Sequence, residues 1–109
     1  MKTQSAKAKG RRAQQEVCRR ILDRFQELKA DDVQSRGMGG GGEDIMLSPL
    51  ARTLFPFSTE VKNQERLNIW ESIKQAQSNS GEHIPLVIFT RNREDMYATL
   101  KLSHLLEIL

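Results

Sequence analysis

Ser58-Thr59-Glu60-Val61-Lys62 is the stretch around which the rest of the chain is expected to fold. On a β-strand, side chains two residues apart lie on one face, so Glu60 and Lys62 would share a face and Val61 would point to the other. An isolated pair of opposite charges at this spacing is also common on exposed strands, where it forms a solvated salt bridge. The choice between these interpretations depends on the neighbouring segments.

A second acidic segment precedes a short apolar run, and its Asp44 lies sixteen positions before Glu60. Glu43 and Asp44 are followed by apolar residues 45–47. If the two runs are neighbouring strands, Asp44 meets Glu60 and Lys62 at one edge of a sheet. Two carboxylates bind a divalent cation through oxygen, with water at the other positions. An ammonium group beside them orients a water or stabilises charge on a phosphate, which is the chemistry of metal-assisted phosphodiester hydrolysis.

Length and composition indicate one small soluble domain. The chain has 109 residues, of which 38% are hydrophobic and 28% charged, as is usual for globular proteins. Cys18 is the single cysteine, which excludes an internal disulfide framework and a cysteine-based zinc cluster. Neither a signal peptide nor an apolar run of membrane-spanning length is present. We therefore expect a cytoplasmic protein without a membrane partner.

Positive charge is concentrated at the N-terminus. Residues 1–29 contain nine Lys or Arg against three Asp or Glu, a net charge of +6, whereas the whole chain carries +3. Residues 1–9 are expected to form a flexible basic arm, and residues 10–109 the folded domain. A basic surface suits a DNA backbone, although a solubilising helix face is an equally open interpretation. The residues expected to contact DNA are Lys7, Lys9, Arg11, Arg12 and Arg36.

The first predicted helix covers residues 10–29. Its apolar side chains recur at helical spacing and comprise Val17, Cys18, Ile21, Phe25 and Leu28. Gln14 falls within this stripe, one turn before Cys18, whereas Glu16 falls nearly opposite. Gln14 is therefore the residue expected to face a site beneath the helix.

The remaining pattern predicts a mixed α/β sheet flanked by helices, in the order αβββαββ. Strands are expected at residues 33–36, 44–47, 58–62, 86–90 and 96–101. Helices are expected at 67–78 and 104–109, the second capped by Ser103. Residues 50–57 read as an apolar turn. The glycine-rich residues 37–42 read as a connector, or as a loop that approaches a ligand such as DNA.

Residues 42–45 (Gly-Glu-Asp-Ile) and 60–62 (Glu-Val-Lys), followed by a helix and an apolar strand, resemble the PD-(D/E)xK nuclease superfamily. The resemblance covers residues 7–101 and implies a restriction-endonuclease-like core. The short chain and the Lys9-Gly10 pair before the first helix are similar to archaeal-type Holliday-junction resolvases and to small phage-encoded proteins predicted to be nucleases. A phage protein would act in the host cytoplasm.

The resemblance implies a Mg²⁺ or Mn²⁺ site. Asp44 and Glu60 would be ligands, the backbone carbonyl of Val61 would complete the site, and Lys62 would orient the attacking water or stabilise the transition state. The family has proline before its first aspartate, and this chain has Glu43 there, which is a competing ligand. Strand alternation favours Asp44, because the following apolar side chain should then point to the core.

Two glutamines are further candidates. Archaeal-type resolvases carry a glutamate on the first helix, four residues after the glycine, and Gln14 occupies that position here. Gln14 would bind a metal-bound water or a phosphate without adding charge, and Glu16 replaces it if the helix register differs. Many relatives use a glutamine on the helix after the Glu-x-Lys strand. Gln75 fits by its sequence neighbours, whereas periodicity places Gln77 nearer the face of Trp70.

The expected function is a metal-dependent DNA endonuclease selective for branched DNA, acting as a homodimer that presents two sites to a four-way junction. A less selective nuclease for duplex or flap DNA is the alternative within the same chemistry. A catalytically silent DNA-binding module is the alternative outside it. Trp70 is expected in the core or in a dimer contact. The apolar residues 102–109 are expected to fold onto the core or to pair with a second subunit.

Overall fold

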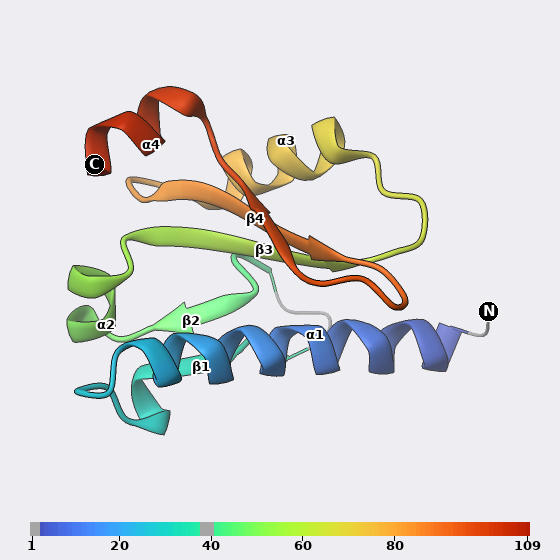
Figure 1. Ribbon diagram of the computed structural model, residues 1–109, viewed down its shortest axis with the longest axis horizontal. Helices are drawn as coiled ribbons and strands as arrows, with labels where there is room; N and C mark the ends of the chain where they lie inside the picture. Colours follow the sequence, from blue (N-terminus) through green and yellow to red (C-terminus); the bar gives the residue numbers. More distant parts are fainter. Residues whose placement is uncertain (1–2, 38–40) are drawn as a thin grey trace.

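The centre of the computed structural model, which describes residues 3–37 and 41–109, is a three-stranded sheet. Its strands are β3 (Phe57–Asn63), β4 (Ile84–Thr90) and β5 (Tyr97–Thr99). β3 runs parallel to β4, which places Glu60 opposite Val87, and β4 runs antiparallel to β5. Figure 1 shows β3 and β4 side by side across the middle of the molecule. The predicted α/β class is confirmed.

A second, two-stranded antiparallel sheet contains β1 (Val33–Ser35) and β2 (Ile45–Leu47). The residue before β2 joins it to the larger sheet, because the backbone N–H of Asp44 donates to the carbonyl of Thr59 at 2.9 Å. The carbonyl of Asp44 in turn accepts from the N–H of Arg36 at 2.8 Å. Asp44 is therefore the backbone link between β1, β2 and β3.

The helices α1 (Thr3–Arg24) and α3 (Ile69–Asn79) pack on opposite faces of β3. Val61 belongs to the hydrophobic core beneath α1, whereas Glu60, its neighbour on the strand, bonds to a side chain of α3. This alternation is the two-residue period of a strand. The core beneath α1 consists of Ala13, Val17, Cys18, Ile21, Leu28, Val33, Ile45, Ala51 and Val61.

The first helix differs from its prediction at both ends. It begins at Thr3 and ends at Arg24, rather than covering residues 10–29. Residues 3–9, expected in a flexible arm, are thus helical; Ala and Lys in this segment favour a helix, which tolerates Gly10 in its interior. Leu28 still reaches the core, because a turn after the helix bonds its N–H to the carbonyl of Phe25 at 2.9 Å.

Residues 50–57, expected as a turn, contain the short helix α2 (Pro49–Leu54). Ser48 caps it, since its hydroxyl accepts from the N–H of Ala51 at 3.1 Å, and Pro49 occupies the first helical position. The Ser-Pro pair that ends a strand therefore also starts a helix. A 3₁₀ turn, η1 (Ala30–Asp32), precedes β1, and the Asp32 carboxylate accepts from the Ser48 hydroxyl at 2.6 Å.

The C-terminal elements are close to their predicted positions. α3 begins two residues later than expected, with Asn68 as its cap. The last strand, β5, is shorter than residues 96–101. The last helix, α4 (Leu102–Ile108), starts after Lys101, so Ser103 lies inside it and is not its cap. No helix of the described residues is long and apolar enough to cross a membrane.

Candidate active site

Asp44 and Glu60 come together where β2 meets β3. The backbone N–H of Val61 donates to Oδ2 of Asp44 at 2.8 Å, so the aspartate side chain lies along β3 beside the glutamate. The Asp44 carboxyl is near enough to Glu60 to raise its pKa. Asp44 and Glu60 are therefore brought together as predicted, by the bond to Val61 and by the backbone bond of Asp44 to Thr59.

Glu60 is a buried acid, with only 2% of its surface exposed. Its pKa is raised from 4.5 to about 7, mainly by burial and also by the neighbouring Asp44 carboxyl, against the opposing effects of the Asn79 hydrogen bond and the charge of Lys62. Two neighbouring carboxyl groups repel each other when both are ionised. A cation between them would remove that repulsion, which is a physical reason for divalent binding here.

Lys62 lies on the same face of β3 as Glu60 and is half-buried. It lines a polar hollow between the end of β3 and α3, and Gln75 of α3 lines the same hollow. Gln77 instead lines a separate hollow together with Trp70 and the start of α4. Of the two candidate glutamines, Gln75 is thus the one on the side of Lys62, while periodicity placed Gln77 correctly beside Trp70.

Asn79, the last residue of α3, was not predicted as a site residue. Its side-chain amide donates to Oε1 of Glu60 at 2.8 Å. In the sequence, Asn79-Ser80-Gly81 reads as a helix stop. The available signal was the helical spacing of Asn79 from Ser72 and Ala76, both of which are buried against the sheet.

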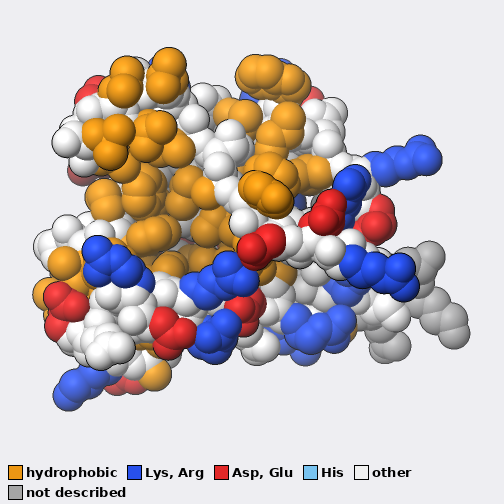
Figure 2. All heavy atoms as spheres, in the orientation of Figure 1, with side chains coloured by type: hydrophobic (Ala, Val, Ile, Leu, Met, Phe, Trp, Pro, Cys, Tyr) orange, Lys and Arg blue, Asp and Glu red, His pale blue; other side chains and the backbone are white. Residues whose placement is uncertain are grey.

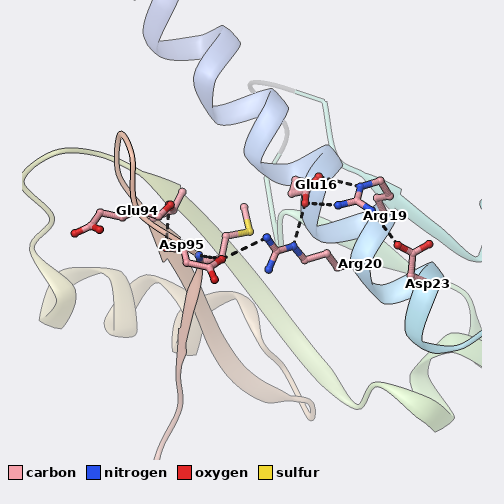
Figure 3. Close-up of polar contacts among 8 residues, drawn as sticks. Glu16, Arg19, Arg20, Asp23, Glu94 and Asp95 are labelled. Carbon is pink, nitrogen blue, oxygen red and sulfur yellow. Dashed lines mark hydrogen bonds and ion pairs between the residues drawn. The ribbon is translucent and has the colours of Figure 1, made fainter.

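The first helix turns Gln14 inward, as expected from its place in the apolar stripe. Gln14 is 7% exposed, but its amide forms no hydrogen bond with Asp44 or Glu60 among the residues described. Glu16 faces the other way and accepts from Arg19 and Arg20, each at 3.0 Å (Figure 3). These hydrogen bonds hold the pKa of Glu16 at about 2. Glu16 therefore does not replace Gln14.

Glu43, the competing candidate ligand, forms its polar contacts within the described part of the chain with two arginines and not with Glu60. It is buried and forms an ion pair with Arg52 of α2, whose guanidinium also donates to the carbonyl of Phe57 at 3.0 Å. Its backbone carbonyl accepts from Arg36 at 2.6 Å. Asp44 is the acid that lies beside Glu60, as strand alternation predicted.

The residues expected to contact DNA fall into two groups. Lys7, Arg11 and Arg12 are exposed on α1. Lys9 lies 3.9 Å from Glu65, with 12% of its side chain exposed, and Arg36 folds over Gly42 toward a backbone carbonyl. Figure 2 shows Lys and Arg side chains along the lower part of the molecule, where α1 lies. Residues 38–40 of the glycine-rich segment lie outside the described part of the chain.

Two carboxylates and a backbone carbonyl are the oxygen donors of this site. Across residues 3–37 and 41–109, no group of three or more His, Cys, Asp or Glu is arranged to hold a metal ion. Mg²⁺, however, is commonly bound by one or two carboxylates, with waters and substrate phosphates as its other ligands. The Val61 carbonyl leaves β3 on the same side as its N–H, toward Asp44. The donor set therefore fits Mg²⁺ or Mn²⁺.

The remaining metal-binding residue types belong to other parts of the fold. Cys18 is packed in the core beneath α1, where burial raises its pKa. His83 is exposed before β4, and His104 lies on α4.

Comparisons with models of known protein families, with curated proteins and with solved structures found no match. The functional assignment accordingly depends on the geometry of Asp44, Glu60 and Lys62.

Proposed function

We propose that this chain is a metal-dependent DNA endonuclease with the restriction-endonuclease-like core of the PD-(D/E)xK superfamily. The observation that supports the proposal best is the position of Asp44, bonded to the N–H of Val61 and adjacent to the buried Glu60. Lys62 follows on the same strand face. These three residue types at one sheet edge provide cation ligands and a positive charge for phosphodiester hydrolysis.

Each residue has a distinct role in the proposed reaction. Asp44, Glu60 and the Val61 carbonyl would hold Mg²⁺ or Mn²⁺. When bound, the ion acts as a Lewis acid on the phosphate and lowers the pKa of a bound water. Lys62 would orient the attacking water and stabilise negative charge on the phosphate, because it follows Glu60 on the same face of β3. Water attacks phosphorus, the bond to the leaving oxygen breaks, and that oxygen takes up a proton.

The polar surroundings suggest how DNA would be bound. Gln75 lines the hollow beside Lys62 and would hydrogen-bond a phosphate or sugar there. Gln14, which faces inward from α1, would hydrogen-bond a water or a phosphate. Arg11 and Arg12, with Lys7, present exposed positive charge on α1 for neighbouring phosphates. Lys9 and Arg36 would reach DNA by exchanging their present partners for phosphate.

A homodimer acting on branched DNA is the proposed form of the enzyme. Trp70, expected in the core or in a dimer contact, is 73% exposed and thus outside the core. Leu102 and Leu106 of α4, and Leu109 directly after it, are exposed as well. Figure 2 shows apolar side chains gathered on the upper part of the molecule, where α4 and α3 lie. Pairing of two copies through this surface would bury it and supply two sites for two DNA strands.

A cleavage assay tests the function directly. A labelled four-way junction and a matching duplex are incubated with the protein in Mg²⁺ and in EDTA, beside Lys62→Ala and the control Lys101→Ala, an exposed lysine before α4. Symmetrical nicks in the junction alone, abolished by EDTA and by Lys62→Ala but not by Lys101→Ala, support the structure-selective enzyme. Cleavage of both substrates indicates the less selective nuclease. Salt-sensitive binding without cleavage indicates the silent module.

The silent module is a second candidate because of one feature of the first helix. Gln14 stands where the resembling resolvases have a glutamate, so the site has two acidic side chains rather than three. Under this alternative, Gln14→Glu would restore cleavage to an otherwise inactive protein. Under the proposed function, the natural sequence cleaves DNA with Gln14 in place.

A further inference from the structure

We infer that Asn79 is a positioning residue, which holds the carboxylate of Glu60 in the orientation that binds the divalent cation. The inference rests on the proposed function, since it assigns a role within that site. It starts from the 2.8 Å hydrogen bond between the Asn79 amide and Oε1 of Glu60. The two residues come from different elements, α3 and β3, so the bond depends on the packing between them.

The end of α3 is attached to β3 at two points. Besides the bond to Glu60, the backbone carbonyl of Asn79 accepts from the hydroxyl of Ser58 at 3.3 Å. Ser58 and Glu60 are two residues apart and share the face of β3 that α3 covers. Ser58 is itself fully buried, and Ser80, the residue after the helix, is buried as well. These contacts fix the position from which the Asn79 amide donates.

Asn79 has no substitute as a partner for Glu60 within the described residues. Glu60 is nearly inaccessible to solvent, so bulk water does not orient its carboxylate. Lys62 influences Glu60 through its charge but forms no hydrogen bond with it in the described structure. Asp44 has its own donor, the N–H of Val61. Each acid of the site is therefore held by one hydrogen bond: Asp44 by the backbone, and Glu60 by Asn79.

Hydrogen bonds of this kind matter for metal affinity. Carboxylates that bind metals are usually oriented by outer partners, and loss of such a partner typically weakens metal binding about 10- to 100-fold. The same bond also satisfies a buried polar group, which would be a purely structural role. The two roles predict different cation affinities for a variant that lacks the Asn79 amide. If the role is only structural, the cation replaces the lost partner of Glu60, and the variant binds it at least as tightly as the wild type. If Asn79 positions Glu60, the carboxylate is no longer oriented and the variant binds the cation more weakly.

The experiment measures Mn²⁺ binding by calorimetry without DNA, together with the rise in melting temperature that Mn²⁺ produces. Asn79→Leu removes the donor at similar size, and Asn79→Ala removes it together with the side-chain volume. Gln77→Leu is the matched control, since Gln77 is exposed on the same helix and lines the other hollow. We expect both Asn79 variants to bind Mn²⁺ about 10- to 100-fold more weakly, with a smaller Mn²⁺-induced rise in melting temperature. The control should match the wild type.

Other outcomes separate this inference from the proposed function. If the wild type binds Mn²⁺ and the folded Asn79 variants bind it equally well or more tightly, Asn79 has only a structural role and the inference is overturned alone. If one Asn79 variant does not fold, the Mn²⁺ affinity of the other variant decides between the two roles. Asn79→Leu fills the volume of the asparagine side chain, whereas Asn79→Ala leaves a cavity there. If the wild type binds no Mn²⁺, the metal site itself is wrong and the inference falls with it.

Discussion

The side-chain carboxylate of Asp44 accepts a hydrogen bond from the backbone N–H of Val61 at 2.8 Å. The backbone N–H of Asp44 simultaneously donates to the carbonyl of Thr59. Asp44 thus contacts β3 on both sides of Glu60, which places the two acids next to each other. Because this contact joins the smaller sheet to the larger one, the candidate active site and the junction between the sheets are the same feature of the fold.

Asp44→Asn is expected to abolish cation binding while preserving the fold. An asparagine keeps a side-chain oxygen that can accept from Val61, but it removes the negative charge. We expect DNA cleavage in Mg²⁺ to fall by at least about 100-fold, since loss of even an outer partner of a metal ligand costs about 10- to 100-fold. Asp31→Asn, at an exposed aspartate of η1, is the control and should cleave like the wild type. Unchanged cleavage by folded Asp44→Asn would remove Asp44 from the site.

Glu60 should make the metal-free protein less stable as the pH rises. Its pKa is about 7 in the folded chain against an ordinary 4.5, so the folded state binds more protons than the unfolded state between these values. Stability therefore falls as the pH rises from about 4.5 to 7, and above this window the loss reaches up to about 3 kcal/mol. Glu60→Gln should lack this contribution to the pH dependence of stability. If the difference in melting temperature between the wild type and Glu60→Gln does not change with pH, the prediction is contradicted. Melting temperatures at pH 4.5, 6 and 8 in EDTA measure the effect.

Glu43 should contribute to stability and not to metal binding. Its ion pair with Arg52 is largely buried, and removal of one partner leaves the other charge unpaired. We expect Arg52→Met to lower the free energy of unfolding by about 3 kcal/mol, measured by denaturation in urea. Glu43→Gln should bind Mn²⁺ as tightly as the wild type. Weaker binding by this variant would instead make Glu43 a ligand.

Arg11 and Arg12 should contact DNA through phosphate charge rather than base sequence. Each phosphate contact that is lost should lower the slope of log affinity against log salt by about 1. The Arg11→Ala/Arg12→Ala variant is therefore expected to bind junction and duplex DNA more weakly, with a reduced salt dependence, as measured by fluorescence anisotropy. Arg91→Ala, at an exposed arginine before the β4–β5 turn, serves as the control. Equal salt slopes for all three proteins would rule out this role.

The apolar surface of α4 should mediate dimerisation. Leu106 is 62% exposed, and a charge at this position would oppose its burial between two copies. We expect Leu106→Lys to be monomeric and the wild type dimeric in analytical ultracentrifugation. Leu50→Lys tests whether any exposed leucine has this effect, since Leu50 lies on α2 and is 50% exposed. A monomeric wild type would contradict the homodimer.

Local patterns in the chain predicted much of the fold and part of the candidate site. The two-residue period of a strand placed Glu60 and Val61 on opposite faces, and the helical period turned Gln14 inward and Glu16 outward. Such patterns are reliable because each depends on the geometry of a single element. Predictions at element ends were weaker. The starts of α1 and α4 were misplaced and the short helix α2 was expected as a turn, because helix ends depend on caps and neighbouring contacts.

Local patterns predicted the main helices and strands, their order, and the face on which each carries acidic, basic or apolar residues, but not the short helix α2. The partners of the buried polar groups follow from the packing of the elements alone: Asp44 with Val61, Glu43 with Arg52, and Asn79 with Glu60. These pairs join residues that are 9 to 19 positions apart in the chain and lie on different elements or loops. The physical reason is that periodicity specifies the direction of a side chain, whereas a hydrogen bond requires two elements to pack at a set distance.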